Sequence, residues 1–154
     1  MNNSIITQAK KGNIKNIVKI HKKCIVETNV NTYDPKVIES WLEQINEKNV
    51  LSQFDNTSWI IIKKSNKIIG FGQYDLEDQD LYQIQIDPGY QGRGYGKKLY
   101  RYIEKEFIKN NRNKISLNAA LNAKDFYISL GFKPLENILF GDIEMICMEK
   151  NLVK

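Results

Sequence analysis

Residues 86–99 read IDPGYQGRGYGKKL, and this segment is the most informative part of the 154-residue chain. An apolar, strand-like run that includes Leu81, Ile84 and Ile86 precedes it and stops at a Pro-Gly pair. Glycines then alternate at positions 92, 94 and 96. A helical pattern follows, whose apolar stripe consists of Leu99, Tyr102, Ile103 and Phe107. The segment therefore predicts a strand, a glycine-rich turn and a helix in immediate succession.

The alternating glycines are typical of a turn that binds phosphate. Without a Cβ atom, the backbone can turn its N–H groups outward. These donors act together with the positive end of the helix dipole to cradle phosphate oxygens. Arg93, Lys97 and Lys98 add positive charge at the same place. The segment predicts a site for a cofactor that carries a pyrophosphate. A glycine-rich surface loop that binds nothing is the alternative, although such a loop would not need the flanking strand and helix.

The spacing of the glycines distinguishes this turn from other nucleotide-binding loops. A dinucleotide fingerprint needs G-x-G-x-x-G and an acidic residue about 20 positions later, whereas this chain has G-x-G-x-G, with Ser116 at that distance from Gly96. The Gly-Lys-Ser/Thr triplet of a Walker loop does not occur. The segment Gln91–Gly96 resembles instead the Q/R-x-x-G-x-G/A acyl-CoA loop of the GNAT (Gcn5-related N-acetyltransferase) superfamily, and it matches every fixed position.

A second segment resembles the same superfamily. Residues 123–132 read AKDFYISLGF, similar to the A-x-x-F-Y-x-x-x-G-F pattern of that group. The spacing predicts a short helix that Gly131 ends in a left-handed cap, with Phe132 beginning the next strand. The resemblance covers roughly residues 59–149. It implies an α+β, three-layer fold with a mixed, mostly antiparallel sheet flanked by helices and a V-shaped splay between its fourth and fifth strands.

The remaining patterns agree with this order of elements. We expect strands at 5–7, 59–62, 67–72, 81–87, 115–118 and 143–148 and helices at 13–27, from Asp34-Pro35 onward, at 95–109 and at 123–130. Residues 135–142 are interpreted as a loop before the last strand. Neither repeats nor linkers interrupt the pattern, which predicts a single domain over residues 1–154.

The resemblance implies acetyl-CoA as co-substrate and assigns candidate residues to it. The pantetheine arm would lie between the splayed strands and bond to the backbone near Ile84, Gln85 and Ile86. The pyrophosphate would lie on the loop formed by Gln91, Gly92, Arg93, Gly94, Tyr95, Gly96 and Lys97. Further contacts to the far side of the cofactor are expected from Asn118, Asn122 and Lys124.

The chemistry of acetyl transfer to an amine needs a base, a donor at the thioester oxygen and an acid for the departing thiolate. By resemblance Tyr127 is the candidate acid, with a plain core aromatic as the alternative. Asp80 is the candidate base, although it belongs to an acidic turn, and a water held by Gln83 or Gln85 is the alternative. On the same alignment, the Ile84 N–H faces the thioester oxygen. His21 lies on an apolar helical stripe and is interpreted as a core or cleft-lining histidine.

The acceptor is expected to be the primary amine of a small molecule or peptide, and Glu27, Tyr33 and Trp41 are candidates to line its pocket. Acetyl transfer is expected to be direct, in a ternary complex of protein, acetyl-CoA and amine. Two alternatives stay open: a non-catalytic acyl-CoA-binding or regulatory module on the same fold, and a binder of nucleotide phosphates or nucleic acid. The nucleic-acid alternative is disfavoured because the lysines behind the net charge of +5 are scattered along the chain.

Composition sets the remaining expectations. A 42% hydrophobic and 27% charged chain is typical of a globular protein. It contains no apolar run of membrane-spanning length, and its first residues do not begin a signal peptide. The two cysteines, Cys24 and Cys147, have no metal-ligand spacing. We therefore expect a cytoplasmic protein with reduced cysteines and no metal, acting as a monomer or homodimer.

Overall fold

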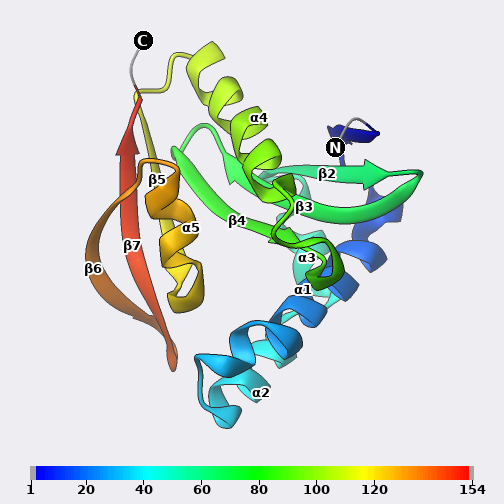
Figure 1. The fold of residues 1–154 in the computed structure, drawn as a ribbon, viewed down its shortest axis with the longest axis vertical. Coiled ribbons are helices and arrows are strands. Elements are labelled where there is room, and N and C mark those ends of the chain that lie inside the picture. Colours follow the sequence, from blue (N-terminus) through cyan, green and yellow to red (C-terminus); the bar gives the residue numbers. More distant parts are fainter. Residues whose placement is uncertain (1–2, 153–154) are drawn as a thin grey trace.

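The computed structural model describes residues 3–152, which form a seven-stranded sheet with helices on both faces (Figure 1). The strand order is β1-β2-β3-β4-β5-β7-β6. The strands are β1 (Ser4–Gln8), β2 (Ser58–Lys64), β3 (Lys67–Asp75), β4 (Asp80–Ile86), β5 (Lys114–Ala120), β6 (Lys133–Phe140) and β7 (Ile143–Asn151). The helices are α1 (Ile14–Glu27), α2 (Pro35–Gln44), α3 (Glu47–Phe54), α4 (Tyr95–Lys109) and α5 (Lys124–Ser129).

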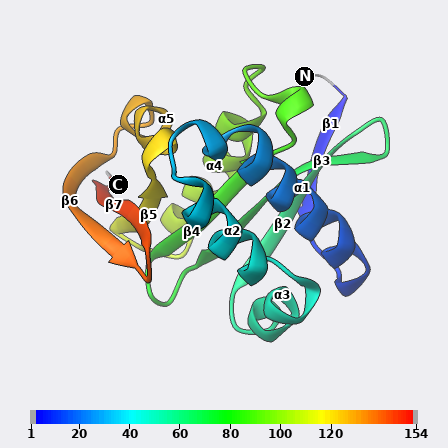
Figure 2. The ribbon, with the colours of Figure 1, turned by 90° about the horizontal axis from the view of Figure 1, so that it is seen from below.

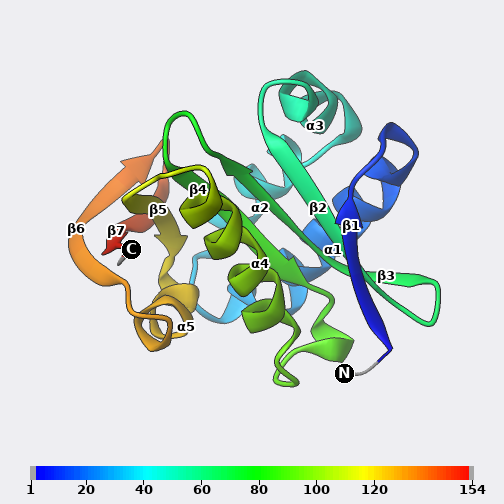
Figure 3. The same ribbon diagram turned by 90° about the horizontal axis from the view of Figure 1, so that it is seen from above.

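Each face of the sheet has its own hydrophobic core. Helices α4 and α5 cover one face (Figure 3), where Leu99, Ile103 and Phe107 of α4 are completely buried. Helices α1, α2 and α3 cover the other (Figure 2), with Ile17 and Ile25 of α1 in the core beneath them. Complete burial of one such side chain stabilises the fold by about 1.5–3 kcal/mol. The sheet is thus the middle of three layers, as expected.

The sheet is mixed, because β4 and β5 run parallel while every other neighbouring pair is antiparallel. The two parallel strands pair at one position, where Asp80 lies opposite Ser116 and the Ser116 N–H donates to the Gln79 carbonyl at 2.8 Å. Beyond this point the two strands diverge (Figure 1). The predicted V-shaped splay between the fourth and fifth strands is therefore confirmed.

Two features differ from the sequence interpretation. Residues 135–142 are not a loop, since most of them belong to strand β6, which pairs with β7 along its length. This edge strand has exposed side chains on both faces, so it lacks the alternation that marks a half-buried strand. Helix α3 was also missed. Its N-cap is Asn46, whose side chain accepts a hydrogen bond from the Asn49 N–H at 2.9 Å.

No helix within residues 3–152 combines the length and the apolar character that crossing a membrane requires.

Candidate active site

The glycine-rich segment forms a left-handed turn that leads directly into α4. Gly92 has a φ of +76° and Gly94 has a φ of +89°, a conformation that costs a residue with a Cβ atom about 1–2 kcal/mol. Gly94 is the N-cap of α4 and has no side chain to cap the first turn. The first-turn N–H groups of a 15-residue helix therefore point toward the turn, as the phosphate-cradle interpretation requires.

The third glycine of the motif serves close packing. Gly96 has an ordinary helical backbone, but a Cβ atom there would lie 3.3 Å from the Phe126 ring and 3.7 Å from the Ile86 side chain. The motif therefore brings α4, α5 and the end of β4 together at one point.

The cations of this segment have separate positions. Lys97 lines the cleft beside the turn. The Arg93 guanidinium lies 5.6 Å from the centre of the Tyr90 ring, and Arg93 is not among the cleft-lining residues. The Lys98 ammonium donates to the Ser4 carbonyl at 2.8 Å and ties α4 to β1. The expectation that Lys98 adds charge to the phosphate site is therefore wrong.

The backbone of β4 exposes two residues to the open side of the splay. The Asp87 N–H donates to the Ile69 carbonyl at 2.8 Å, and Ile86 lies opposite Gly70. Hydrogen-bonded pairs alternate in an antiparallel ladder, so the backbone of Gln85 bonds to β3 while the N–H and C=O groups of Ile84 and Ile86 face β5. Of the three residues expected to offer backbone groups to a pantetheine arm, Ile84 and Ile86 have N–H and C=O groups that face the open side of the splay.

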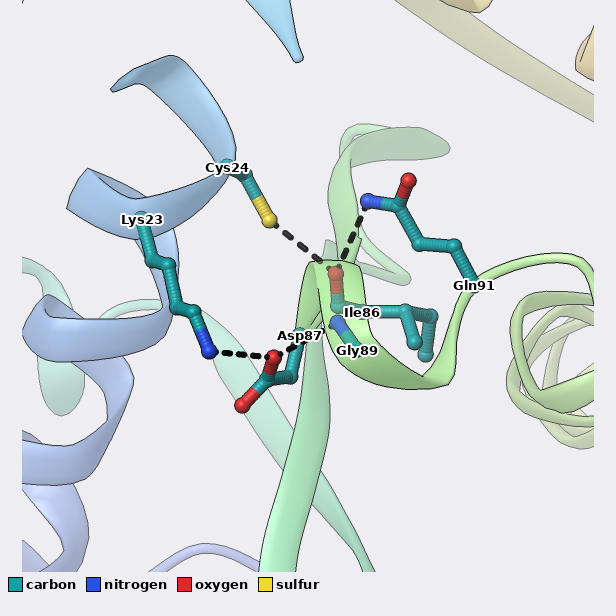
Figure 4. Close-up of polar contacts among 6 residues, drawn as sticks. All are labelled: Lys23, Cys24, Ile86, Asp87, Gly89 and Gln91. Atoms are coloured by element: carbon teal, nitrogen blue, oxygen red, sulfur yellow. Dashed lines mark hydrogen bonds and ion pairs between the residues drawn. The ribbon is translucent and has the colours of Figure 1, made fainter. Parts of the chain in front are cut away.

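Two side chains hold the end of β4 in this position (Figure 4). The Ile86 carbonyl accepts from the Gln91 side-chain amide at 3.0 Å and from the Cys24 thiol at 3.1 Å. Burial raises the pKa of Cys24 to about 12, so its thiol stays protonated and can donate. Gln91 thus contributes to the site by fixing the turn onto β4.

These elements enclose a cleft of about 680 Å³ at the opening of the splay. Its lining includes thirteen of the residues proposed from the sequence: Trp41, Ile84, Gln85, Ile86, Gln91, Gly92, Gly94, Tyr95, Gly96, Lys97, Asn118, Asn122 and Tyr127. The volume is within the range of ordinary ligand sites, about 300–1,000 Å³. Residues from α1, α2, β4, α4, β5 and α5 therefore converge on one cavity.

Tyr127 connects the two arms of the splay. It belongs to α5, beside β5, yet its phenol is hydrogen-bonded to the backbone of Ile84 on β4. Burial raises the pKa of Tyr127 well above its ordinary value, and the bond from Ile84 opposes part of that rise. The phenol is therefore protonated at neutral pH and lies at the backbone group that faces the open cleft.

A row of amides, which sequence reasoning identified only in part, lines the face of the cleft toward α1. Gln85 donates to Gln83 at 3.3 Å, and Gln83 donates to Gln73 at 2.9 Å. Gln73, which is 2% exposed, donates in turn to Gln53 of α3 at 2.8 Å. On β3, Gln73 is a buried polar residue two positions after the buried Phe71, so both lie on the same face of the strand. A polar residue at a position where an apolar one is expected was the signal in the sequence. The row fixes Gln83 and Gln85 in orientation beside the cleft.

His21 also lines the cleft and packs edge-on against Phe71, with ring centres 6.0 Å apart. Burial lowers the pKa of His21 to about 4, so its imidazole is neutral at pH 7. The interpretation as a cleft-lining histidine agrees with this position.

Five proposed residues are not among those that line the cleft: Glu27, Tyr33, Asp80, Arg93 and Lys124. Asp80 lies at the closed end of the splay, opposite Ser116, so the structure does not bring it to Tyr127. Tyr33 is buried, and its hydroxyl donates to the Glu144 carbonyl at 2.6 Å and accepts from the Leu121 N–H at 2.8 Å. Its ring packs against Trp41, so Tyr33 supports a cleft residue. The roles proposed for these five residues stay predictions.

Within residues 3–152, no group of three or more His, Cys, Asp or Glu side chains is arranged to hold a metal ion.

Comparisons with known proteins agree with this geometry. The model of the acetyltransferase (GNAT) domain family matches residues 29–152. A GCN5-related N-acetyltransferase from Rhodopseudomonas palustris superimposes with a TM-score of 0.91 at 17% identity, covering 99% of this chain and 98% of that one. PaiA N-acetyltransferase from Thermoplasma acidophilum, whose structure contains coenzyme A, has a TM-score of 0.83 at 20% identity, with 97% and 99% coverage.

Sequence similarity to a curated protein is local. The chloroplastic GCN5-related N-acetyltransferase 2 of Arabidopsis thaliana is 30% identical over 74 residues, which are 46% of this chain and 29% of that protein. This chain thus spans less than a third of the length of that relative. The family model, by contrast, covers most of the chain and includes both motifs, the splay and most of the cleft lining. The chain therefore belongs to the GNAT acetyltransferase family.

Proposed function

We propose that this protein transfers the acetyl group of acetyl-CoA to a primary amine of a small molecule or peptide, by direct transfer in a ternary complex. One observation carries the proposal: the exposed backbone of β4, the glycine turn before α4 and the protonated phenol of Tyr127 all meet in one cleft. The coenzyme A in the PaiA structure supports the choice of co-substrate.

The cleft offers one surface for each part of the co-substrate. The N–H groups at the start of α4, together with Lys97, would hold the pyrophosphate. The Ile84 carbonyl and the Ile86 N–H, which face the open side of the splay, would bond to the pantetheine amides, as an added strand bonds to a sheet edge. Asn118 and Asn122 line the opposite wall and would contact the far side of the cofactor.

The transfer step follows from the position of Tyr127. The amine nitrogen attacks the thioester carbonyl carbon, and the Ile84 N–H, once its bond to the Tyr127 phenol gives way to the bound thioester, stabilises the negative charge that develops on the oxygen. As the carbon–sulfur bond breaks, the Tyr127 hydroxyl donates its proton to the departing sulfur. Because burial raises the pKa of Tyr127, the phenol carries its proton when the carbon–sulfur bond begins to break.

The amine must lose a proton as it attacks. Among residues 3–152, the cleft lining contains no aspartate or glutamate. We therefore favour a water held on the oriented amides of Gln83 and Gln85 as the proton acceptor. Asp80 stays the alternative base. Trp41, His21 and Gln73 line the side of the cleft toward α1 and α2, where the acceptor would bind. Glu27 and Tyr33 stay candidates at its margin.

A cytoplasmic location and a monomeric or homodimeric state stay part of the proposal, and the two free cysteines support the first.

The test combines an acceptor screen with one substitution. Release of CoA thiol is measured with amino acids, polyamines, aminoglycosides and peptide N-termini as acceptors. With an accepted amine, Tyr127→Phe should leave acetyl-CoA affinity within a few-fold and lower turnover by about 10²- to 10⁴-fold. Tyr102→Phe removes a hydroxyl from α4 outside the cleft lining and should change neither quantity.

The same experiment separates the alternatives. Binding of acetyl-CoA without thiol release for any amine would favour the non-catalytic module. Unchanged turnover in Tyr127→Phe, with the chemical step limiting the rate, would show that Tyr127 is only a packing residue.

A further inference from the structure

A second cavity of about 520 Å³ lies outside the cleft, between the first half of α1 and the hairpin turn that joins β2 to β3. We call it the lysine pocket, because Lys19 and Lys23 of α1, Lys63 of β2 and Lys67 of β3 all line it. The two lysines of α1 are far in the sequence from the two lysines of the hairpin, and the packing of α1 against the sheet brings the two pairs together. None of the residues proposed above for the cofactor or the acceptor lines this cavity.

The charge in the lysine pocket is unbalanced. Asp87 is the acidic residue of its lining, and the Lys23 ammonium already bonds to that carboxylate at 2.9 Å (Figure 4). The Lys67 ammonium lies 5.4 Å from the centre of the Tyr90 ring. Within the described part of the chain, no carboxylate forms an ion pair with Lys19, Lys63 or Lys67. Gathered ammonium groups repel one another and create a positive potential that attracts anions.

Neutral hydrogen-bonding groups complete the wall. The amides of Asn13, Asn16 and Asn66 also line the pocket. Asn66 is held in the left-handed hairpin turn, with a φ of +65°. Lysine ammonium groups act as compact point charges, and with amide donors they suit the oxygens of a phosphate. The volume is sufficient for a small phosphorylated molecule.

We propose that the lysine pocket is a binding site for a phosphate-bearing ligand, distinct from the glycine turn. The phosphate has two possible sources, the 3′-phosphate of CoA itself and a separate phosphorylated metabolite. The pocket adjoins the cleft, because the Asp87 carboxylate that accepts from Lys23 also accepts from the Gly89 N–H at 2.9 Å. That segment leads directly to Tyr90 and Gln91 of the cleft. The proposal does not depend on acetyl transfer.

The test is a titration of the ¹⁵N-labelled full-length chain with pyrophosphate at constant ionic strength, followed by amide chemical shifts. In the wild type, shifts are expected at residues 13–23 and 63–68. The double variant Lys19→Gln/Lys63→Gln removes two cations that contact nothing in the cleft and should weaken binding at these residues by about tenfold. The control Lys105→Gln/Lys133→Gln has the same net charge, alters exposed lysines elsewhere and should bind as the wild type does.

Two further arms identify the source of the phosphate. If a separate metabolite binds, pyrophosphate still shifts the pocket residues of protein saturated with CoA. If the 3′-phosphate of CoA fills the pocket, CoA abolishes these shifts whereas dephospho-CoA does not. The proposal is overturned if pyrophosphate shifts only residues 92–97, or if both double variants bind it equally at the pocket. Each of these chemical-shift measurements can be made whether or not the protein transfers acetyl groups, so failure of this proposal is distinguishable from failure of the proposed function.

Discussion

The Gly92→Ala variant tests whether CoA binding requires the left-handed backbone of the glycine turn, separately from any change in the stability of the fold. Gly92 has a φ of +76°, and no atom lies within 4 Å of the position that a Cβ atom would take. The substitution therefore introduces no steric clash, and its effect comes from the left-handed backbone, which costs alanine about 1–2 kcal/mol. Because no backbone hydrogen bond between described residues holds Gly92 itself, we expect the unliganded turn of the variant to relax to a negative φ.

CoA must then restore the left-handed turn before the N–H groups can face its pyrophosphate. The cost of about 1–2 kcal/mol becomes a loss of affinity, since the competent conformation is only fractionally populated. We expect the dissociation constant for CoA, measured by isothermal titration calorimetry, to rise about 5- to 30-fold.

Gly141→Ala is the matched control. Gly141 has a φ of +60°, also has no atom within 4 Å of its Cβ position, and does not line the cleft. The pairing of Phe140 with Ile143 closes this turn and holds its left-handed backbone. We therefore expect the melting temperature of the variant to fall by about 2–8 °C, from a cost of about 1–2 kcal/mol, with unchanged CoA affinity. If Gly92→Ala binds CoA as tightly as the wild type and Gly141→Ala do, the turn does not hold the pyrophosphate and the reasoning is refuted.

Three further predictions concern other parts of the structure. The folded-state pKa of His21, about 4, lies below its unfolded value of 6.5. The contribution of neutral His21 to stability is therefore complete above pH 6.5 and is lost as the pH falls toward 4. Denaturant unfolding of the wild type should show a loss on the order of 1–2 kcal/mol in the free energy of unfolding between pH 7 and 5, and His21→Gln should lack this loss. Gly70→Ala should destabilise the fold by about 1–3 kcal/mol or more, because its Cβ atom would lie 2.5 Å from the Ile86 side chain and 2.8 Å from a backbone oxygen. The control Gly12→Ala has free space around its Cβ position and should be neutral in the same unfolding assay. Asp80→Asn should leave the pH–rate profile unmoved, because residue 80 lies at the closed end of the splay; a rate loss at neutral pH that higher pH rescues would instead make Asp80 the base.

Features that depend on local backbone geometry can be predicted from the residues alone. Alternating glycines between a strand and a helix identify a left-handed turn at the start of α4, because few other residues adopt a positive φ at low cost. The spacing of Ala123, Phe126 and Tyr127 before Gly131 likewise located α5. Strand β6 was missed because its side chains are exposed on both faces, so neither helical nor alternating periodicity marks it.

Which side chains meet depends on how the helices pack on the sheet. Packing of α1 onto the sheet brings His21 and Cys24 to the end of β4, more than 60 positions later in the sequence. The single pairing between β4 and β5 places Asp80 at the closed end of the splay and leaves Tyr127 at the open end. Such positions depend on contacts between residues distant in sequence, and no local pattern encodes them. For that reason the glycine turn and the candidate acid Tyr127 could be proposed from the residues. The amide row, the position of Asp80 and the lysine pocket could be recognised only from the folded structure.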